Sequence, residues 1–214
     1  MTAVGLLGGA FDPVHKGHTT LAQVAMQRYD LAEVIFIPSA SPPHKTGRKI
    51  TSFHHRLEMV ILAITEEERF MISEIERYMA PPTYSIDMLA SLPDEKTTGR
   101  QYHFIIGTDA FFELRTWKAY NRLLQQVHFI VIHRQGYEPK NMNAYIQSLG
   151  YTPAGDHWCN RMSGRRIYYT GAKIPEVSSS QIRRTIGTSD FPEDCLSPQV
   201  YEYIQNYGLY TDTR

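Results

Sequence analysis

A short apolar run that leads into a glycine-rich turn is the feature that most constrains this fold. Residues 4–7 form the run, and the segment Gly8-Gly9-Ala10-Phe11-Asp12-Pro13-Val14 separates it from His15 and His18. The run is typical of a strand, and the apolar spacing behind the histidines predicts an amphipathic helix. Glycines let backbone N–H groups approach an anion, and a helix N-terminus attracts negative charge. The segment therefore predicts a strand, a phosphate-binding loop and a helix with both histidines on one face.

Strand and helix patterns alternate along the rest of the chain. Apolar runs predict further strands at residues 33–38, 70–75, 102–106, 127–133 and 167–170. Amphipathic or capped stretches predict helices at residues 53–65, 85–92, 141–149, 179–186 and from 198 onward, with Ser85 as the cap of the second. Residues 150–166 show no clear period, so we expect them to be irregular.

This alternation predicts an α/β, Rossmann-like fold, in which helices cover both faces of a doubly wound, mainly parallel sheet. The length fits one domain spanning residues 1–214. Right-handed crossovers place the loops after residues 7, 37, 106 and 133 along one edge of such a sheet. Open α/β sheets bind ligands at that edge.

The composition argues against several classes of protein. Lys plus Arg and Asp plus Glu both number 22, so no global basic field attracts nucleic acid. Cys159 and Cys195 are too few for a disulfide framework, and neither cysteines nor histidines have metal-ligand spacing. The chain shows no basic leader and no long apolar segment. We therefore expect a cytoplasmic protein with no membrane partner and no metal site of its own.

The opening segment resembles a known signature. Residues 8–18, GGAFDPVHKGH, are similar to the GGxFDPxHxGH pattern of the HxGH nucleotidyltransferases, and more narrowly to that of bacterial nicotinate-nucleotide adenylyltransferases. The resemblance implies that His15 and His18 contact the ATP phosphates and stabilise the transition state. It also implies ATP contacts from the preceding loop, at Gly8, Gly9, Ala10 and Phe11. Because the family commonly has Thr or Ser at the position of Ala10, only a backbone contact carries over there.

Two proline-containing segments resemble further family motifs. Residues 42–45, PPHK, are similar to a family segment that places Lys45 at the triphosphate; a solvated lysine is the alternative. Residues 82–85, PTYS, resemble a PSYT segment near the mononucleotide, which implies contacts from Thr83, Tyr84 and Ser85. A simple helix cap would explain the same residues.

Two later segments complete the resemblance. Residues 107–117 are similar to GxDxxxxLxxW, which implies Gly107 and Asp109 at the adenosine and Trp117 stacked on the nicotinate ring. A tryptophan packed in the core is the alternative for Trp117.

Residues 177–183, VSSSQIR, resemble ISSTxIR, which implies phosphate contacts from Ser179 and Ser180 and a catalytic role for Arg183. A helix cap with a solvated arginine is the alternative. Arg134 resembles an arginine that the family keeps at the nucleotide site. Arg56 either matches a family position or braces the PPHK loop of residues 42–45 by a surface ion pair.

The resemblance extends to residues 203–210, YIQNYGLY, and so covers nearly the whole chain. It implies AMP transfer from ATP to nicotinate mononucleotide in NAD biosynthesis, giving deamido-NAD and pyrophosphate by direct in-line attack. Mg²⁺ would be carried with ATP, and the protein would be a monomer or a homo-oligomer. Nicotinamide mononucleotide and phosphopantetheine remain alternative acceptors. A nucleic-acid binding module is a third interpretation, which the zero net charge disfavours.

Overall fold

A central sheet organises the molecule, and the computed structural model describes residues 1–43, 50–133, 142–172 and 174–211. Its eight strands lie in the order β3-β2-β1-β4-β5-β8-β7-β6. The pairs from β3 to β8 are parallel, whereas β7 is antiparallel to both of its neighbours. The strands are β1 (Thr2–Gly9), β2 (Glu33–Pro38), β3 (Phe70–Ile72), β4 (Arg100–Gly107), β5 (His128–Ile132), β6 (Thr152–Ala154), β7 (His157–Cys159) and β8 (Arg166–Thr170).

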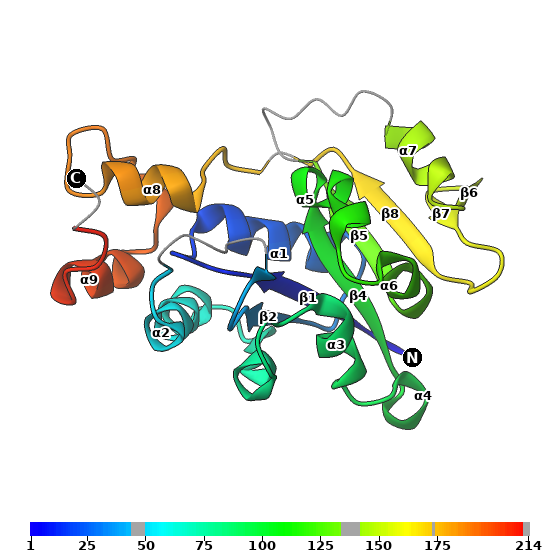
Figure 1. Ribbon diagram of the computed structural model, residues 1–214. Helices are drawn as coiled ribbons and strands as arrows, with labels where there is room; N and C mark the ends of the chain where they lie inside the picture. The colour runs from blue at the N-terminus through cyan, green and yellow to red at the C-terminus, as the bar shows by residue number, and fades with distance from the viewer. Residues whose placement is uncertain (44–49, 134–141, 173, 212–214) are drawn as a thin grey trace.

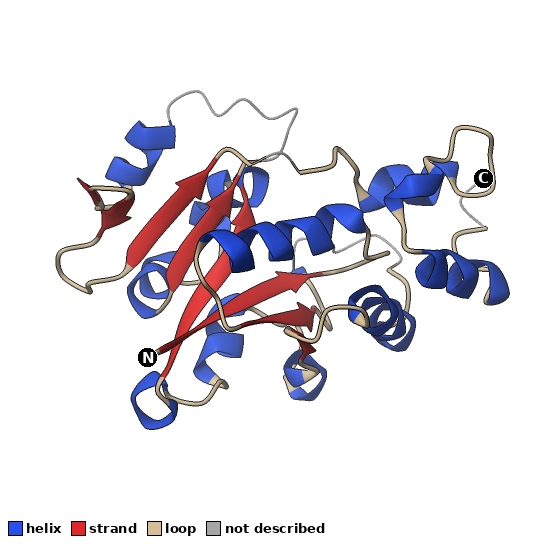
Figure 2. Cartoon of the chain, turned by 180° about the vertical axis from the view of Figure 1, so that it is seen from behind, coloured by secondary structure: helices blue, strands red, loops and turns tan. Residues whose placement is uncertain are grey.

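Helices cover both faces of this sheet, as the views from the front and from behind show (Figures 1 and 2). One buried apolar cluster joins the sheet to α1 (Lys16–Arg28), α2 (Phe53–Ile64), α8 (Ser179–Thr185) and α9 (Pro198–Asn206). A second cluster on the opposite face includes α3 (Ser85–Ala90), α5 (Thr108–Phe112), α6 (Tyr120–Gln126) and α7 (Met142–Ser148). The short elements are α4 (Glu95–Thr98) and the 3₁₀ turns η2 (Ile75–Tyr78), η3 (Leu114–Thr116) and η4 (Glu193–Cys195). The expected Rossmann-like α/β fold is confirmed.

The central strand β1 depends on a glycine. A Cβ atom at Gly5 would lie 2.7 Å from Ile105 Cδ1 and 3.0 Å from side-chain atoms of Leu31 and Val34. The neighbouring strands and the α1–β2 connection therefore pack directly on the backbone of β1. The carboxyl ends of the parallel strands lie in register, with Gly9 beside Pro38 and Gly107 beside Ile132. Among the described residues, the loops that follow β1 and β4 therefore begin along one edge of the sheet, as the sequence predicts.

Three local expectations differ from the structure. Residues 150–166 are not irregular throughout, because β6 and β7 form an antiparallel hairpin at the sheet edge. All residues of β6 are exposed, so the hairpin lacks the apolar alternation that would have indicated a strand. Strand β3 ends at Ile72 rather than near residue 75, where the chain turns into η2. Ser85 does not cap α3, because Tyr84 occupies the N-cap position and makes no side-chain capping bond.

Two buried histidines stack between neighbouring strands on the face that α1 covers. The rings of His103 and His128 lie 4.9 Å apart at 22°, and His128 Nδ1 accepts a hydrogen bond from the Arg166 backbone N–H at 3.1 Å. Burial and the nearby His103 and Arg165 lower the pKa of His128 to about 3, and burial lowers the pKa of His103. Both rings are therefore neutral in the folded protein at neutral pH.

This pair predicts a loss of stability in mild acid. Because the folded pKa of His128 lies below its unfolded value near 6.5, its stabilising contribution is complete above that pH and decreases as the pH falls toward 3. We expect the free energy of unfolding to fall by about 1–2 kcal/mol between pH 7.5 and pH 5 from this group alone. Urea unfolding of the wild type and of His128→Phe at pH 7.5 and pH 5 measures this change in the free energy of unfolding. The variant should be less stable at pH 7.5 but show a smaller pH dependence; an unchanged pH dependence would contradict the assignment.

Candidate functional site

A cavity of about 430 Å³ opens at the carboxyl ends of β1 and β4. Its walls come from the β1–α1 loop, the segment after β2, the region from η2 to α3, and the segment from β4 to Lys118. Most of the predicted site residues line it: Gly8, Gly9, Ala10, His18, Thr83, Tyr84, Ser85, Gly107, Asp109 and Trp117. The structure therefore brings residues of three motifs that are distant in sequence to one cavity, together with Pro42 and Pro43 of the PPHK segment. Lys45 and Arg134 lie outside the described residues.

The β1–α1 loop turns sharply at Phe11. This residue has a φ of 48°, in the left-handed region, and its ring is buried against Phe36 and edge-on to His18 at 5.0 Å. A Cβ atom at Gly9 would lie 3.1 Å from the same ring, so a side chain there would force the Phe11 ring to shift by a few tenths of an ångström. Because its side chain packs behind the loop, Phe11 has only its backbone to offer a ligand.

The two predicted histidines stack at the start of α1. His15 is the N-cap residue, and its backbone N–H donates to His18 Nδ1 at 3.2 Å, while the ring centroids lie 3.8 Å apart. Since Nδ1 of His18 accepts this bond, a neutral His18 ring carries its hydrogen on Nε2. His15 is buried at 3% exposure, whereas His18 lines the cavity. His18 is thus the histidine placed to donate to a ligand, with His15 behind it.

Gly17 allows this stacking, and the sequence analysis did not assign it a role. A Cβ atom at Gly17 would lie 2.9 Å from His15 Nδ1 and 3.1 Å from Val177 Cγ1. Any side chain would therefore push against both the histidine ring and the segment that leads into α8. In the sequence, the spacing of three residues between the two histidines already indicated that a histidine ring would approach the backbone closely at Gly17.

Donors from distant segments bind the carbonyl oxygens of the β1–α1 loop. The Ser39 backbone N–H donates to the Gly9 carbonyl at 2.8 Å, and Arg56 Nη1 to that of Ala10 at 2.6 Å. Ser179 Oγ donates to the Pro13 carbonyl at 2.9 Å. The oxygens that would repel an anion are therefore engaged by protein donors, which favours binding of a phosphate at this loop.

Arg183 lies beneath the loop and does not line the cavity. Its Nη1 donates to the Asp12 carbonyl and lies 3.7 Å from Asp12 Oδ2, while Nη2 donates to Ser180 Oγ at 3.0 Å. The Tyr210 hydroxyl donates to Asp12 Oδ1 at 2.9 Å. Burial and the Asp12 carboxylate raise the pKa of Tyr210, so its hydroxyl keeps its hydrogen at neutral pH. Ser179, Ser180 and Arg183 thus hold the loop in this structure, and their predicted contacts to phosphate stay predictions.

Arg56 is a buried brace. It is 1% exposed, and besides the Ala10 carbonyl it binds the Thr51 carbonyl through Nε at 2.8 Å. Burial lowers its pKa, an effect that the Asp12 carboxylate opposes. The sequence left open a brace of the PPHK loop by a surface ion pair. In the structure Arg56 is instead buried and braces the β1–α1 loop by a hydrogen bond to the Ala10 carbonyl.

The wall formed by η2 and the start of α3 contains a carboxylate that the sequence analysis missed. Glu76 is 6% exposed, and its Oε2 accepts from Ser39 Oγ at 2.9 Å, from the Ala40 N–H at 3.1 Å and from Thr83 Oγ1. The predicted residue Thr83 is therefore buried with its hydroxyl bonded to Glu76. Nothing in the charged stretch around Glu76 distinguishes it from an exposed residue.

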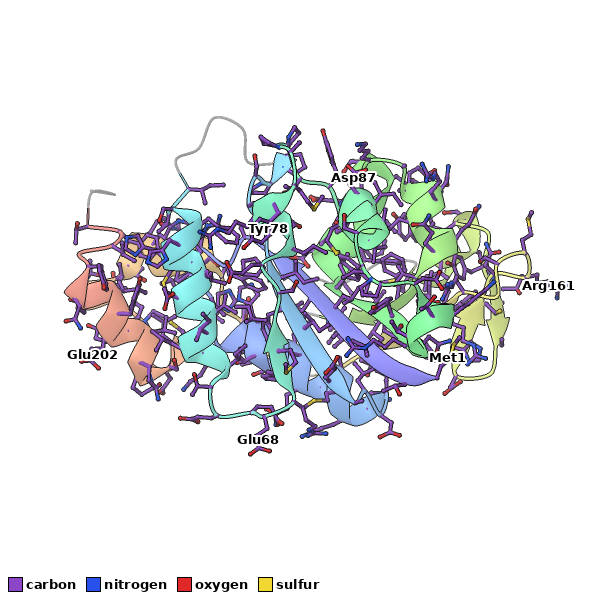
Figure 3. The ribbon with its side chains drawn as sticks, turned by 90° about the horizontal axis from the view of Figure 1, so that it is seen from below. Met1, Glu68, Tyr78, Asp87, Arg161 and Glu202 are labelled. Carbon is purple, nitrogen blue, oxygen red and sulfur yellow. The ribbon has the colours of Figure 1, made fainter. Side chains whose placement is uncertain are left out.

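The opposite wall presents the predicted aromatic ring. Trp117 is partly buried, packs edge-on against Phe104 with centroids 6.0 Å apart, and lines the cavity. Next to it, Lys118 Nζ lies 2.8 Å from Asp87 Oδ2 and 4.5 Å from the centre of the Tyr84 ring. Asp87 lies on α3 at the edge of the molecule (Figure 3). Trp117 is therefore neither a wholly buried core residue nor free of packing contacts.

The described side chains include no group of three or more His, Cys, Asp or Glu placed to hold a metal ion. None of the described helices is long and apolar enough to cross a membrane.

Comparisons with known proteins agree with this fold and indicate a family. The model of the cytidylyltransferase-like family matches residues 6–185. A probable nicotinate-nucleotide adenylyltransferase of Desulfotalea psychrophila is 39% identical over 98% of this chain and 100% of its own length. The corresponding protein of Pelobacter propionicus is 34% identical over 98% of both chains.

Solved structures resemble the chain in fold. A nicotinic acid mononucleotide adenylyltransferase of Plasmodium falciparum, complexed with NaAD, superposes with a TM-score of 0.70 at 19% identity over 98% of both chains. A putative nicotinate-nucleotide adenylyltransferase of Vibrio parahaemolyticus gives 0.64 at 18% identity, over 100% of this chain and 98% of its own. The family match and the full-length relatives show that the chain belongs to the nicotinate-nucleotide adenylyltransferase family of cytidylyltransferase-like proteins.

Proposed function

We propose that this protein transfers AMP from ATP to nicotinate mononucleotide, forming deamido-NAD and pyrophosphate. The observation that carries the proposal is the single cavity of about 430 Å³ that joins the β1–α1 loop and His18 to Trp117. A phosphate-binding loop and a flat aromatic ring in one cavity suit a reaction between a triphosphate and a pyridine mononucleotide. Membership of the family supports the same acceptor.

The proposed roles follow the two ends of the cavity. The β1–α1 loop, from Gly8 to Phe11, and His18 bind the ATP phosphates, with Gly107 and Asp109 at the adenosine. Trp117 stacks on the nicotinate ring, and residues 83–85 contact the mononucleotide. Lys45 and Arg134, which the family motifs place at the nucleotide, add positive charge. Arg183, Ser179 and Ser180 act on the phosphates through the loop that they hold.

The reaction proceeds by direct attack. A phosphate oxygen of the mononucleotide attacks the α-phosphorus of ATP while the bond to the bridging oxygen of pyrophosphate breaks, with no covalent enzyme intermediate. Positioning and electrostatic stabilisation supply the rate enhancement. His18 donates from Nε2 to a phosphate oxygen on which charge develops, and His15 orients it. Mg²⁺ enters as part of the MgATP substrate. We further propose that the protein acts in the cytoplasm as one domain on small-molecule substrates.

The acceptor is the first testable prediction. The purified protein is incubated with MgATP and, in turn, nicotinate mononucleotide, nicotinamide mononucleotide and phosphopantetheine, and pyrophosphate release is followed. We expect kcat/KM for nicotinate mononucleotide to exceed the other two by at least about tenfold, which corresponds to about 1.4 kcal/mol. Preference for phosphopantetheine, or no turnover with either pyridine mononucleotide, would overturn the proposed function.

Removal of the His18 ring tests the phosphate chemistry. His18→Ala should lower kcat by about 10²–10³-fold, because a donor to the developing charge is lost. The fold should lose only about 0.5–1.5 kcal/mol, the contribution of its bond to the His15 backbone. His54→Ala, on the exposed side of α2, is the matched control and should keep full activity. A fully active or unfolded His18→Ala protein would contradict the assigned role.

Gly17→Ala tests the stacking of the histidines without removing either ring. The added Cβ displaces His15 by contact at 2.9 Å, and we expect kcat to fall by about tenfold or more. The melting temperature should change little, because Ala favours a helix over Gly by about 1 kcal/mol and offsets part of the clash. Gln23→Ala, an exposed change on the same helix, is the control. Equal kcat values for both variants would show that the close approach has no catalytic importance.

A further inference from the structure

A buried carboxylate in the cavity wall has no part in the phosphate chemistry proposed above. Glu76 lies on η2, is 6% exposed and lines the cavity. Tyr78, two residues further along the same turn, is 80% exposed and lies on the outside of the molecule (Figure 3). The short helix therefore directs one carboxylate inward, toward the substrates.

One oxygen of this carboxylate is fully used by the protein. Oε2 accepts three hydrogen bonds, from the Ser39 hydroxyl, the Ala40 backbone N–H and the Thr83 hydroxyl. These donors come from the segment after β2 and the segment before α3, so Oε2 joins two walls of the cavity. Three bonds to one oxygen also fix the orientation of the whole carboxylate.

The other oxygen remains available. Oε1 of Glu76 makes no hydrogen bond to any residue that the structure describes, and it is not among the described buried side-chain atoms that lack a partner. Glu76 lines the cavity, and of its two carboxylate oxygens only Oε1 is not bonded to a described residue. A carboxylate held in this way is a preorganised acceptor that requires a donor from a ligand.

The chemistry of the substrates identifies that donor. A nicotinate mononucleotide carries a carboxylate and a phosphate, which Glu76 repels, and its only hydrogen-bond donors are the 2′ and 3′ hydroxyls of its ribose. ATP has ribose hydroxyls and an adenine amino group too, but the proposed function places its adenosine near Gly107 and Asp109, after β4. Glu76 follows β3 and shares its wall with Thr83 and Tyr84, on the other side of β1.

We propose that Glu76 Oε1 accepts a hydrogen bond from a ribose hydroxyl of the mononucleotide acceptor, and so selects a ribonucleotide over its deoxy analogue. This inference rests on the proposed function. The bonds to Oε2 join the two walls, and Oε1, which bonds to no described residue, is left to the substrate. In this proposal the second oxygen gives Glu76 a role in substrate specificity.

The test compares nicotinate mononucleotide with its 2′-deoxy and 3′-deoxy analogues in the wild type and in Glu76→Gln. The glutamine oxygen can keep the three bonds of Oε2, while its NH₂ group replaces Oε1. In the wild type, we expect one deoxy analogue to lose about tenfold or more in kcat/KM, the effect of one charge-assisted hydrogen bond. In Glu76→Gln, kcat/KM for nicotinate mononucleotide should be about tenfold lower than in the wild type. In that variant, kcat/KM for the same deoxy analogue should lie less than about threefold below that for nicotinate mononucleotide.

Two controls separate this role from a structural one. Discrimination between ATP and 2′-deoxy-ATP should be the same in both proteins, because Glu76 faces the acceptor. Glu74→Gln, the same substitution on a residue that pairs with Arg77 at 2.8 Å and does not line the cavity, should retain the wild-type discrimination.

Three results would overturn the inference. The first is equal use of all three mononucleotides by the wild type, which needs no variant and so remains decisive even where Glu76→Gln does not fold. The second is a Glu76→Gln protein in which the deoxy analogue loses as much kcat/KM, relative to nicotinate mononucleotide, as it does in the wild type. The third is a Glu76→Gln protein in which only the discrimination between ATP and 2′-deoxy-ATP changes. Absence of turnover with nicotinate mononucleotide in the wild type would instead refute the proposed function itself, and this inference with it.

Discussion

The arrangement of the site depends on the hydrogen bonds that hold the carbonyl oxygens of the β1–α1 loop. Arg56 from α2 and Arg183 from α8 both donate to this loop, and both are buried. Burying a guanidinium is unfavourable unless its donors are satisfied and its charge is balanced. The loop supplies the acceptors and Asp12 supplies the charge, so loop and arginines depend on one another. Removing either partner would leave the other buried without compensation.

The same network connects the ends of the chain. The Tyr210 hydroxyl binds Asp12, and Asp12 also contacts Arg183, so the segment after α9 takes part in holding a loop that forms near the N-terminus. Figure 1 shows α8 and α9 beside the carboxyl-terminal end of β1, beyond α1 and α2. The C-terminal helices therefore serve the site indirectly, by supporting the segment on which the phosphates are proposed to bind.

How far the sequence predicts the structure depends on what each residue contacts. The buried run at β2 and the amphipathic α2 are recognisable because apolar periodicity directly reflects burial. The hairpin of β6 and β7 is not, because β6 is exposed throughout and β7 is uniformly of intermediate burial, so neither shows an alternating pattern. Arg183 shows a further limit: its motif indicates a fork of donors near phosphates, but only the fold shows that the fork binds the carbonyl of Asp12. Glu76 lies in a stretch with Glu74 and Arg77 that resembles any solvated turn, and only its three donors distinguish it.

The order of strands supports the proposal that one cavity takes two nucleotides. Across the sheet edge, β3, β2, β1 and β4 are successive neighbours. The turn after β3 carries Glu76, the loop after β1 has its carbonyls engaged by donors, and the helix after β4 carries Asp109. Acceptors for hydroxyl groups thus lie on either side of a segment suited to anions. A dinucleotide has the same order, since two riboses flank its phosphates. The parallel sheet sets this order because each connection returns its loop to the same edge, at a position determined by its strand.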